Sequence, residues 1–470
     1  MPRLQLSPIG KLWMVLPSSI LVYLALAYSQ WTQSTPRNIF TETQPVKVPT
    51  QETYHALSLS ERECNAIFPD LTRDLEETIA LGPFTLKQAH GPGPLQARVK
   101  DGQLFIIHAE DESILSSELL QAQQAALHQI NKAILTSPEP LPETIFSLNV
   151  RDQPYGTAMS YTRPAYPAPA SSMPPLTRAF LMPHFSFWNW PLRSIGSISR
   201  ASEAISALEA RLGFTEKDPR VVWRGSAHFN SARNPSLRQD LLHATAGAAW
   251  ADVRALESYE VGSGSSSQNS HRQAAEGAAE EEDGVNMNTV ATREMLMIED
   301  FCRYKYILYT DGITYSGRLS FHQLCNSVIL TPPPAWRQLT THLLRPAFST
   351  DLVPSHQTIP SAFSQDMLDA YPTRYTAHEA NIIFVAPDWS DLEATISWLE
   401  EHPDIAERIA RNQRDLFLGR GYTSPAMETC YWRALLRGWC EVVRLEGEGW
   451  EDEEGVSWEE FSITQSVTQE

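Results

Sequence analysis

The sequence predicts an α/β fold built around an open, parallel, Rossmann-type sheet. The main evidence is residues 304–330, where the strand YKYILYT is followed by a DG turn, a short helix in SGRLSFHQLC and a second strand in NSVILT. A strand, loop, helix and strand in under 30 residues form the half-Rossmann pattern. A second strand, VVW at 221–223, runs directly into Arg224-Gly225-Ser226. Ligands of such sheets lie beyond the carboxyl ends of the strands, where both loops are expected.

Length and composition set the scale of the molecule. The chain has 470 residues, of which 42% are hydrophobic and 10% aromatic. This predicts two domains of ~150–200 residues and excludes disorder of the whole chain. The net charge is −19, but thirteen acids lie in two short runs, 276–283 and 446–460, and the rest of the chain carries only −6. With no excess of Lys and Arg, we expect no nucleic-acid partner.

An uncharged run at 12–28 follows Arg3 and Lys11. A helix of this length rises ~25 Å, enough to span a thin membrane of the early secretory pathway. We expect a single-pass type II signal anchor with residues 1–11 in the cytosol, in the Golgi or endoplasmic reticulum membrane, and the body of the chain in the lumen. The alternative is a cleaved signal peptide ending near residue 27, which would give a secreted protein.

A polar, Pro- and Thr-rich stem at 29–58 leads to a first ordered domain at 60–205. Its first helix is indicated by the fourfold spacing of Leu71, Leu75 and Ile79. The elements expected in this domain are a helix in FPDLTRDLEETIALG, two strands around the DG turn of ARVKDGQLFII, a helix at 114–135 and a buried strand in IFSLNV.

The second domain is expected at 206–440 and contains the half-Rossmann unit. A Gly-, Ser- and acid-rich stretch at 262–288 is typical of a disordered insertion. Ser390 and Glu393 have the spacing of a capping box on the helix DLEATISWLEEH. The other elements expected are a helix at 206–213, the strand at 221–223, helices near 236–243 and at 404–417, an amphipathic helix in METCYWRALLRGWCEVV and an acidic tail at 446–470.

Two arginines are placed to bind an anion. Arg318 stands at the first turn of its helix, next to Ser316 and Gly317, where backbone N–H groups, the helix dipole and a guanidinium fork suit a diphosphate. Arg224 has the same position at the end of another strand. The alternative interpretation is that each arginine simply pairs with a nearby carboxylate.

Asp152 follows a buried strand, and we interpret it as a general base that deprotonates an acceptor hydroxyl. The alternative is a turn former, because it lies two residues before a proline. An aromatic run nearby predicts a platform for a sugar ring, unless it is core with an exposed edge. Its members are His184, Phe185, Trp188 and Trp190.

The chain contains no D-x-D motif and no His pair with metal-ligand spacing, so we expect no metal and no other cofactor. Arginines and a helix dipole would then neutralise a diphosphate. None of the five cysteines forms a C-x-x-C pair, and an oxidising lumen permits two disulfides with one thiol left over. The cysteines are Cys64, Cys302, Cys325, Cys430 and Cys440.

Several motifs in this order resemble glycosyltransferase family 90, the group of fungal capsule-associated xylosyltransferases and animal protein O-glucosyltransferases. They are NVRDQP (149–154), PHFSFWNWP (183–191), WRGS (223–226), FCRYKYILYTDGITYSGRLSFHQLCNSVIL (301–330), DWSDLEATISWLEEH and TCYWRALL. The resemblance covers about residues 60–440. It implies a GT-B fold of two facing Rossmann-like domains, with a UDP-sugar on the C-terminal one and no metal.

Carried over to this chain, the resemblance implies that Asp152 is the catalytic base and that Arg224 and Arg318 face the diphosphate. It also implies the disulfides Cys302–Cys325 and Cys64–Cys430, with Cys440 free. The other donor-binding residues expected are Gly225, Ser226, Asp311, Gly312, Thr314, Tyr315, Ser316 and Gly317.

The leading hypothesis is therefore a luminal, inverting glycosyltransferase that moves xylose or glucose from UDP to a glycan or protein hydroxyl. One alternative is a catalytically silent member that binds glycans or proteins. The segment 350–383 favours that alternative, because it diverges from the pattern of the family. A third, weaker interpretation is a nucleotide-binding α/β module that transfers no sugar.

Overall fold

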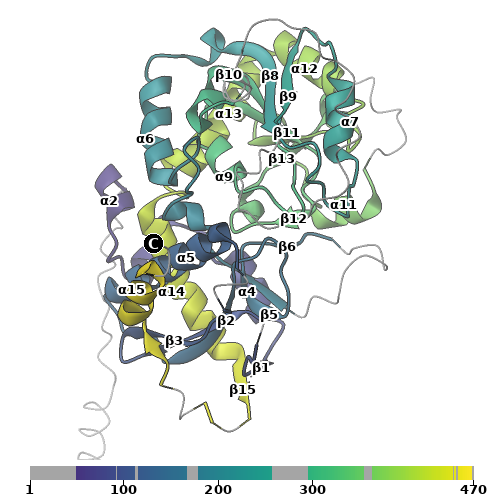
Figure 1. Cartoon of the computed structure of the whole chain (residues 1–470). Helices are drawn as coiled ribbons and strands as arrows, with labels where there is room; N and C mark the ends of the chain where they lie inside the picture. Colours follow the sequence, from purple (N-terminus) through teal and green to yellow (C-terminus); the bar gives the residue numbers. More distant parts are fainter. Residues whose placement is uncertain are drawn as a thin grey trace, which may run out of the picture. The chain divides into compact units, whose positions relative to one another are not determined.

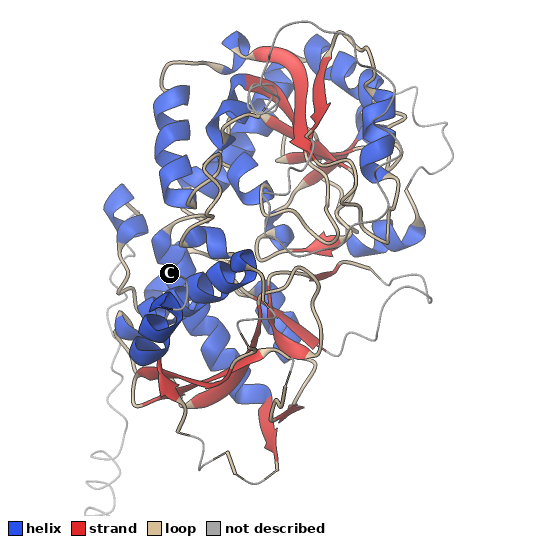
Figure 2. Cartoon of the chain, in the orientation of Figure 1, coloured by secondary structure: helices blue, strands red, loops and turns tan. Residues whose placement is uncertain are grey.

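The structure is a computed structural model that describes residues 49–91, 93–111, 115–166, 178–256, 295–353, 363–447, 449–450 and 454–467. In this part of the chain, helices and parallel strands form a mixed α/β fold, as expected (Figures 1 and 2). The expected anchor, most of the stem and the expected insertion lie outside the described residues. Of the helices that are described, none has both the length and the apolar character needed to cross a membrane.

The first sheet contains the predicted hairpin and the predicted strand before Asp152. Its strands, in spatial order, are β16 (Val456–Ser457), β3 (Gln103–His108), β2 (Leu95–Lys100), β4 (Thr144–Asn149), β5 (Thr157–Ser160) and β7 (Arg178–Leu181). β2 and β3 turn at Asp101 and Gly102, which have φ values of 51° and 71°. β4 is antiparallel to β2 but parallel to β5, so this sheet is mixed rather than wholly parallel.

The second sheet contains the predicted half-Rossmann unit, and all its pairings are parallel. Its strands, in spatial order, are β13 (Pro346–Phe348), β14 (Ile382–Phe384), β11 (Val328–Thr331), β10 (Tyr304–Leu308), β8 (Asp218–Gly225) and β9 (Ala251–Ala255). The chain passes from β8 to β9 on one side and then returns to β10 on the other side. The order of the strands therefore reverses between β8 and β10, which makes that position the topological switch point.

The described helices are short, apart from two long ones. They are α2 (Gln51–His55), α3 (Glu61–Ile67), α4 (Arg73–Ile79), α5 (Ser117–Leu135), α6 (Ile198–Glu209), α7 (Leu237–Ala244), α9 (Leu319–His322), α10 (Ser349–Leu352), α11 (Gln365–Ala370), α12 (Leu392–Glu401), α13 (Pro403–Arg414), α14 (Pro425–Val442) and α15 (Trp458–Val467). Two ribbons pair β1 (Phe84–Lys87) with β15 (Val443–Glu446) and β6 (Arg163–Pro164) with β12 (Trp336–Arg337).

Both faces of the second sheet are covered, as a parallel sheet requires. Alternate residues such as Val221 and Leu308 pack in one cluster with α7, α12 and α13. Their neighbours Val222 and Ile307 belong to the other cluster, which includes Leu319 of α9. The strands are therefore apolar on both sides, and polar groups gather at the strand ends.

Two predictions about helix starts were wrong. The helix predicted at 206–213 begins earlier, at Ile198, because Ser197 caps it by accepting a hydrogen bond from the Arg200 N–H at 3.2 Å. The capping box of Ser390 is absent, because Asp391 is the residue that precedes α12. The Ser390 hydroxyl donates to Asp388 instead, at 2.7 Å.

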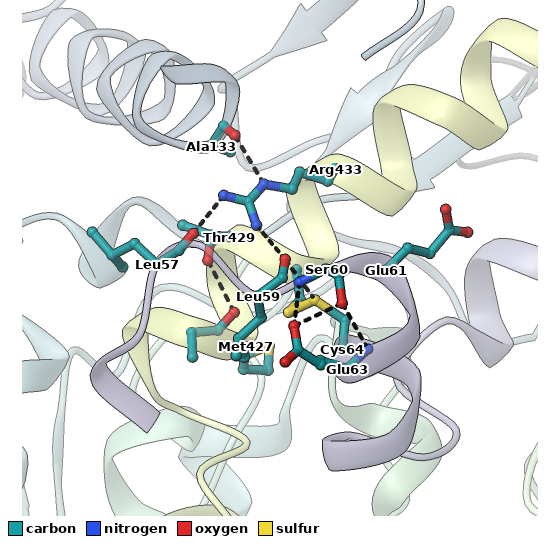
Figure 3. Close-up of a disulfide and its surroundings, with 12 residues drawn as sticks. Leu57, Leu59, Ser60, Glu61, Glu63, Cys64, Ala133, Met427, Thr429 and Arg433 are labelled. Carbon is teal, nitrogen blue, oxygen red and sulfur yellow. Dashed lines mark hydrogen bonds between the residues drawn. A yellow bond between two sulfur atoms is a disulfide. The ribbon is translucent and has the colours of Figure 1, made fainter. Parts of the chain in front are cut away.

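Two disulfides, Cys64–Cys430 and Cys302–Cys325, have the pairing that the resemblance implied, and Cys440 is free. Cys64–Cys430 joins α3 to α14, residues 366 positions apart in sequence. Beside it, the guanidinium of Arg433 donates to three backbone carbonyls, those of Leu57, Leu59 and Ala133 (Figure 3). The N-terminal end of the described chain is therefore tied to its last long helix.

The expected acidic tail contains ordered structure. β15 pairs with β1, β16 adds to the edge of the first sheet, and α15 follows. Trp450 and Trp458 are 4% and 3% exposed, although each lies among carboxylates. Two buried indoles therefore anchor this acidic segment to the fold.

Candidate active site

The site forms at the switch point, where β8 and β10 end in polar loops (Figure 1). Arg224 and Gly225 close β8, and Asp311 follows the end of β10. Arg318, from the loop before α9, donates a hydrogen bond to the Arg224 carbonyl. The two sequence-predicted loops therefore meet, as adjacent parallel strands require.

A third arginine, Arg238 of α7, bonds both of these loops. Its Nε donates to the Asp311 carbonyl at 3.1 Å and its Nη1 to the Ser226 carbonyl at 2.8 Å. Arg238 is 4% exposed, and burial lowers its pKa. Sequence reasoning missed Arg238; the signal was an arginine next to the buried Leu237, in a helix that follows a strand-end loop.

Arg318 and Arg238 lie close enough to repel each other. Desolvation, and then the charge of Arg238, lower the pKa of Arg318 to about 10. Within the described residues, neither guanidinium forms an ion pair with a carboxylate. Since buried charges are normally paired, this arrangement is suited to an anionic ligand. α9 has only four residues, so the guanidiniums rather than a helix dipole carry this charge.

Arg224 is placed differently from the prediction. Its guanidinium forms an ion pair with Asp252 of β9, with an Nη2–Oδ1 distance of 2.8 Å, and Tyr304 Oη donates to the same carboxylate at 2.6 Å. Arg224 contacts Arg318 through its backbone carbonyl, which accepts the hydrogen bond from the Arg318 guanidinium. The carboxylate pairing that the alternative interpretation expected is therefore present at Arg224 and, among the described residues, absent at Arg318.

The loop at 311–318 is held by buried hydrogen bonds. The Asp311 carboxylate accepts from the Ala335 N–H at 2.8 Å and from Tyr309 Oη at 3.2 Å. The same Tyr309 oxygen accepts from the Ser316 N–H at 2.9 Å. Burial raises the pKa of Asp311 to about 7. Asp311 therefore braces the loop from inside rather than pointing freely into a donor pocket.

Glycines allow the closest approaches around this loop. A Cβ on Gly317 would lie 2.7 Å from the His184 ring and 2.9 Å from the Trp190 ring. A Cβ on Gly225 would lie 2.7 Å from the Trp223 ring and 3.2 Å from an Arg318 nitrogen. Both positions therefore need glycine, because the backbone passes directly against rings.

Asp152 lies in the loop after β4, and this loop contacts the 311–318 loop. Thr314 Oγ1 donates to the Asp152 carbonyl at 3.0 Å. The Asn149 side chain fixes the bend by bonding Arg151 N–H at 3.0 Å and the Gln153 carbonyl at 2.9 Å. The Asp152 side chain keeps solvent access, while the surrounding protein desolvates its carboxylate and raises its pKa. A carboxylate with a raised pKa is suited to acting as a base.

The predicted aromatic platform is divided in two. The His184 ring packs with Phe185, Trp190 and Tyr315, at centroid distances of 3.9, 5.2 and 5.7 Å. Burial lowers the pKa of His184 to about 3, so this ring is neutral. Trp188 instead stacks on His128 of α5 at 4.5 Å. His184 and Trp190 therefore adjoin the 311–318 loop, Phe185 packs on both of these rings, and Trp188 packs on α5 instead.

Two small cavities adjoin the arginines. One is lined by Arg224, Ser316 and Arg318 and by His322, whose buried Nδ1 has no hydrogen-bond partner. The other is lined by Asp311, by Tyr166 and by the prolines that follow β11. Searching the described residues for three or more His, Cys, Asp or Glu side chains arranged to hold a metal finds no such group.

Two comparisons relate this chain to known proteins. A family model described as Glycosyl transferase family 90 matches residues 60–367. An "O-glucosyltransferase rumi homolog" from Anopheles gambiae is 25% identical over 164 residues, which cover 34% of this chain and 31% of that protein. The match therefore spans about a third of this curated relative, and the matched family is a family of sugar transferases.

Proposed function

The chain belongs to glycosyltransferase family 90, and from this premise we propose that it moves a sugar from a UDP donor to a hydroxyl group of a glycan or protein. The donor sugar that we propose is xylose or glucose. The fold that we propose is GT-B, with the second sheet binding the donor. The proposed compartment is the Golgi or endoplasmic reticulum, reached through an anchor at 12–28 or by secretion after cleavage.

The observation that carries this proposal is the Arg318 and Arg238 pair at the switch point. Two guanidiniums without carboxylate partners in the described part of the chain match the charge of a diphosphate. Guanidinium forks bind phosphate oxygens through two parallel hydrogen bonds. They also stabilise the charge that develops on UDP as it leaves. We therefore propose that this pair neutralises the diphosphate charge, which other glycosyltransferases neutralise with a metal ion.

Asp152 is the base in this proposal. Its loop meets the donor loop through Thr314, so a hydroxyl bound beside Asp152 also lies near a donor held at Arg318. Asp152 would remove the proton of the acceptor hydroxyl while that oxygen attacks the anomeric carbon and UDP leaves from the opposite face. One displacement inverts the anomeric centre, and no covalent sugar–enzyme intermediate is needed.

The test is hydrolysis of UDP-xylose and UDP-glucose by the purified full chain, with EDTA present. We expect turnover, and we expect Arg318→Ala and Arg238→Ala each to lower it by roughly 10²–10³-fold. Arg220→Ala is the matched control, because Arg220 also belongs to β8 but pairs with Asp218 of the same strand. Unchanged turnover in Arg318→Ala, or an equal loss in Arg220→Ala, would contradict the proposed diphosphate site.

One observation favours the silent-binder alternative. Arg224 forms an ion pair with Asp252, so the charge of one of the two predicted diphosphate ligands is already balanced by a carboxylate. Calorimetric titration with UDP separates the two hypotheses. UDP binding that Arg318→Ala abolishes, without turnover of either donor, would support a binding protein; turnover of either donor would support the enzyme.

A further inference from the structure

Trp188 is an exposed aromatic side chain with an unusually fixed orientation. The residue is 44% exposed, yet its ring lies parallel to the His128 ring, at a centroid distance of 4.5 Å and an interplanar angle of 1°. Burial lowers the pKa of His128, which favours the neutral imidazole in this stack. One face of the indole is therefore covered, and the residue still presents aromatic surface to solvent.

The surroundings hold this ring in place. Trp458 packs edge-on against His128 at 4.8 Å, and Lys132 Nζ lies 5.9 Å from the centroid of the Trp188 ring. Lys132 is itself held by Glu428, at 2.7 Å. Below the ring, Gln129 of α5 donates to the His184 carbonyl at 3.0 Å and fixes the start of the aromatic run. The platform is pre-organised, so a ligand would lose little free energy in ordering it.

The platform adjoins the candidate active site along the chain. Trp190 follows Trp188 by two residues and packs beside Gly317 in the donor loop. Consecutive Cα atoms are about 3.8 Å apart, so the Cα atoms of the two tryptophans are within about 7.6 Å. Trp188 is therefore only two residues along the chain from a ring that packs on the donor loop.

We propose that Trp188 is a separate subsite that binds a pyranose ring of an oligosaccharide acceptor, some units away from the hydroxyl that reacts. This inference rests on the proposed function and specifies its acceptor as a glycan chain. The indole face carries negative charge in its π-system, and the C–H bonds on one face of a pyranose pack against it. Lys132, whose Nζ lies 5.9 Å from the centroid of this ring, provides a hydrogen-bond donor for the hydroxyls of the bound pyranose.

The experiment uses the full chain labelled with 5-fluorotryptophan and observed by fluorine NMR. Comparison with Trp188→Phe identifies the Trp188 resonance among the 13 tryptophans. Xylo-, manno- and gluco-oligosaccharides, from monosaccharide to hexasaccharide, are then titrated at millimolar concentration. We expect a saturable shift of the Trp188 resonance with at least one of the longer oligosaccharides and a weaker response to its monosaccharide.

Variants show whether the ring itself binds. Trp188→Ala should weaken binding of the best oligosaccharide roughly tenfold, the loss expected of an aromatic anchor. Trp188→Phe should retain part of the affinity. Leu192→Ala is the control, because Leu192 is exposed to a similar degree, 49%, and has an aliphatic rather than an aromatic side chain. We expect Leu192→Ala to bind like the unmodified chain.

The two proposals can fail separately. If no oligosaccharide shifts the Trp188 resonance, the subsite proposal is wrong, even if the chain hydrolyses UDP-sugars. The same holds if a folded protein, added as an alternative acceptor, shifts the resonance and no oligosaccharide does. If the resonance shifts but no UDP-sugar is ever turned over, the glycan subsite stands and the proposed enzyme activity does not. Equal affinity of Trp188→Ala and the unmodified chain would also overturn the subsite.

Discussion

The arginines of the candidate site show that a sequence motif does not determine the partners of a side chain in the folded protein. The sequence pointed to Arg224 and Arg318 because each is adjacent to a glycine near the end of a predicted strand. In the structure, Arg224 meets Asp252 on the neighbouring strand, a contact between residues 28 positions apart. Arg238, which belongs to no motif, lies beside Arg318 at the switch point. Loop positions were predictable, whereas the direction of each guanidinium depends on partners from other elements.

Asp152 provides a prediction about pH. Because desolvation raises its pKa above the ordinary 3.8, we expect turnover to fall as the pH decreases through that raised value, which protonates the base. The acid limb of a kcat profile against pH should therefore lie above about pH 4. Asp152→Asn should reduce kcat by roughly 10²–10⁴-fold. A flat acid limb, or an active Asp152→Asn variant, would exclude Asp152 as the base.

Asp311 provides a second prediction about pH, on stability. Its folded-state pKa, about 7, is above the ordinary value of 3.8, so the folded protein holds this proton more tightly than the unfolded chain does. The stability linked to this proton is complete below about pH 3.8 and is lost as the pH rises towards 7. Asp311→Asn cannot ionise. Its melting temperature, relative to that of the unmodified chain, should therefore rise across this interval.

The measurement is a thermal-unfolding series with both proteins in the same buffers. The absolute difference in melting temperature also includes the changed hydrogen bonds to Ala335 and Tyr309, so only its dependence on pH tests the argument. A difference that stays constant, or that falls as the pH rises, would show that the Asp311 carboxylate is not the group that titrates.

At the scale of elements, strands and helices were easier to predict than their ends. The hairpin β2–β3, the strand before Asp152 and the half-Rossmann unit were predicted from alternation, turn residues and spacing, and the structure confirms them. The capping box predicted at Ser390 is absent because α12 begins one residue later, after Asp391, whose side chain makes no capping hydrogen bond. The Asp391 carboxylate accepts from the Ala386 N–H at 2.9 Å and from the Ser349 hydroxyl. Such long-range partners are not visible in a local pattern.

The 311–318 loop depends on the absence of a side chain at Gly317. We expect Gly317→Ala to destabilise the fold by about 1–3 kcal/mol, because the new methyl group overlaps the His184 and Trp190 rings. UDP-sugar turnover should also fall, since Arg318 is the next residue. Urea unfolding and donor hydrolysis measure the two effects. Gly93→Ala is the control, because a Cβ there meets no atom within 4 Å.

At the scale of the whole molecule, contacts between distant parts of the chain were the least predictable. Local patterns could indicate α14 as an amphipathic helix, but not that Arg433 would bind carbonyl groups of the N-terminal segment and of α5. The disulfide Cys64–Cys430 was implied by the family resemblance, not by spacing. The segment at 57–64 is therefore held to α14 by interactions that a reading of single segments cannot identify.

The acidic C-terminal segment makes the same point and leads to a prediction. The sequence indicated only an acidic tail at 446–470, whereas in the structure Trp458 is 3% exposed and packs against His128. Trp458→Ala should cost about 3–5 kcal/mol, the range for emptying a buried indole site. Ile463→Ala in the same helix is the control, because Ile463 is 66% exposed.

Trp458→Ala should also have a local effect, because His128 connects Trp458 to Trp188. We expect the fluorine resonance of Trp188 to move in Trp458→Ala and to stay in place in Ile463→Ala. Losing an edge-on neighbour lets the His128 ring rotate and removes the support of the stacked indole. If Trp458→Ala unfolds at the same urea concentration as Ile463→Ala, the C-terminal segment does not contribute to the stability of the fold. If the fold is weakened but the Trp188 resonance does not move, the segment stabilises the first sheet without supporting the platform.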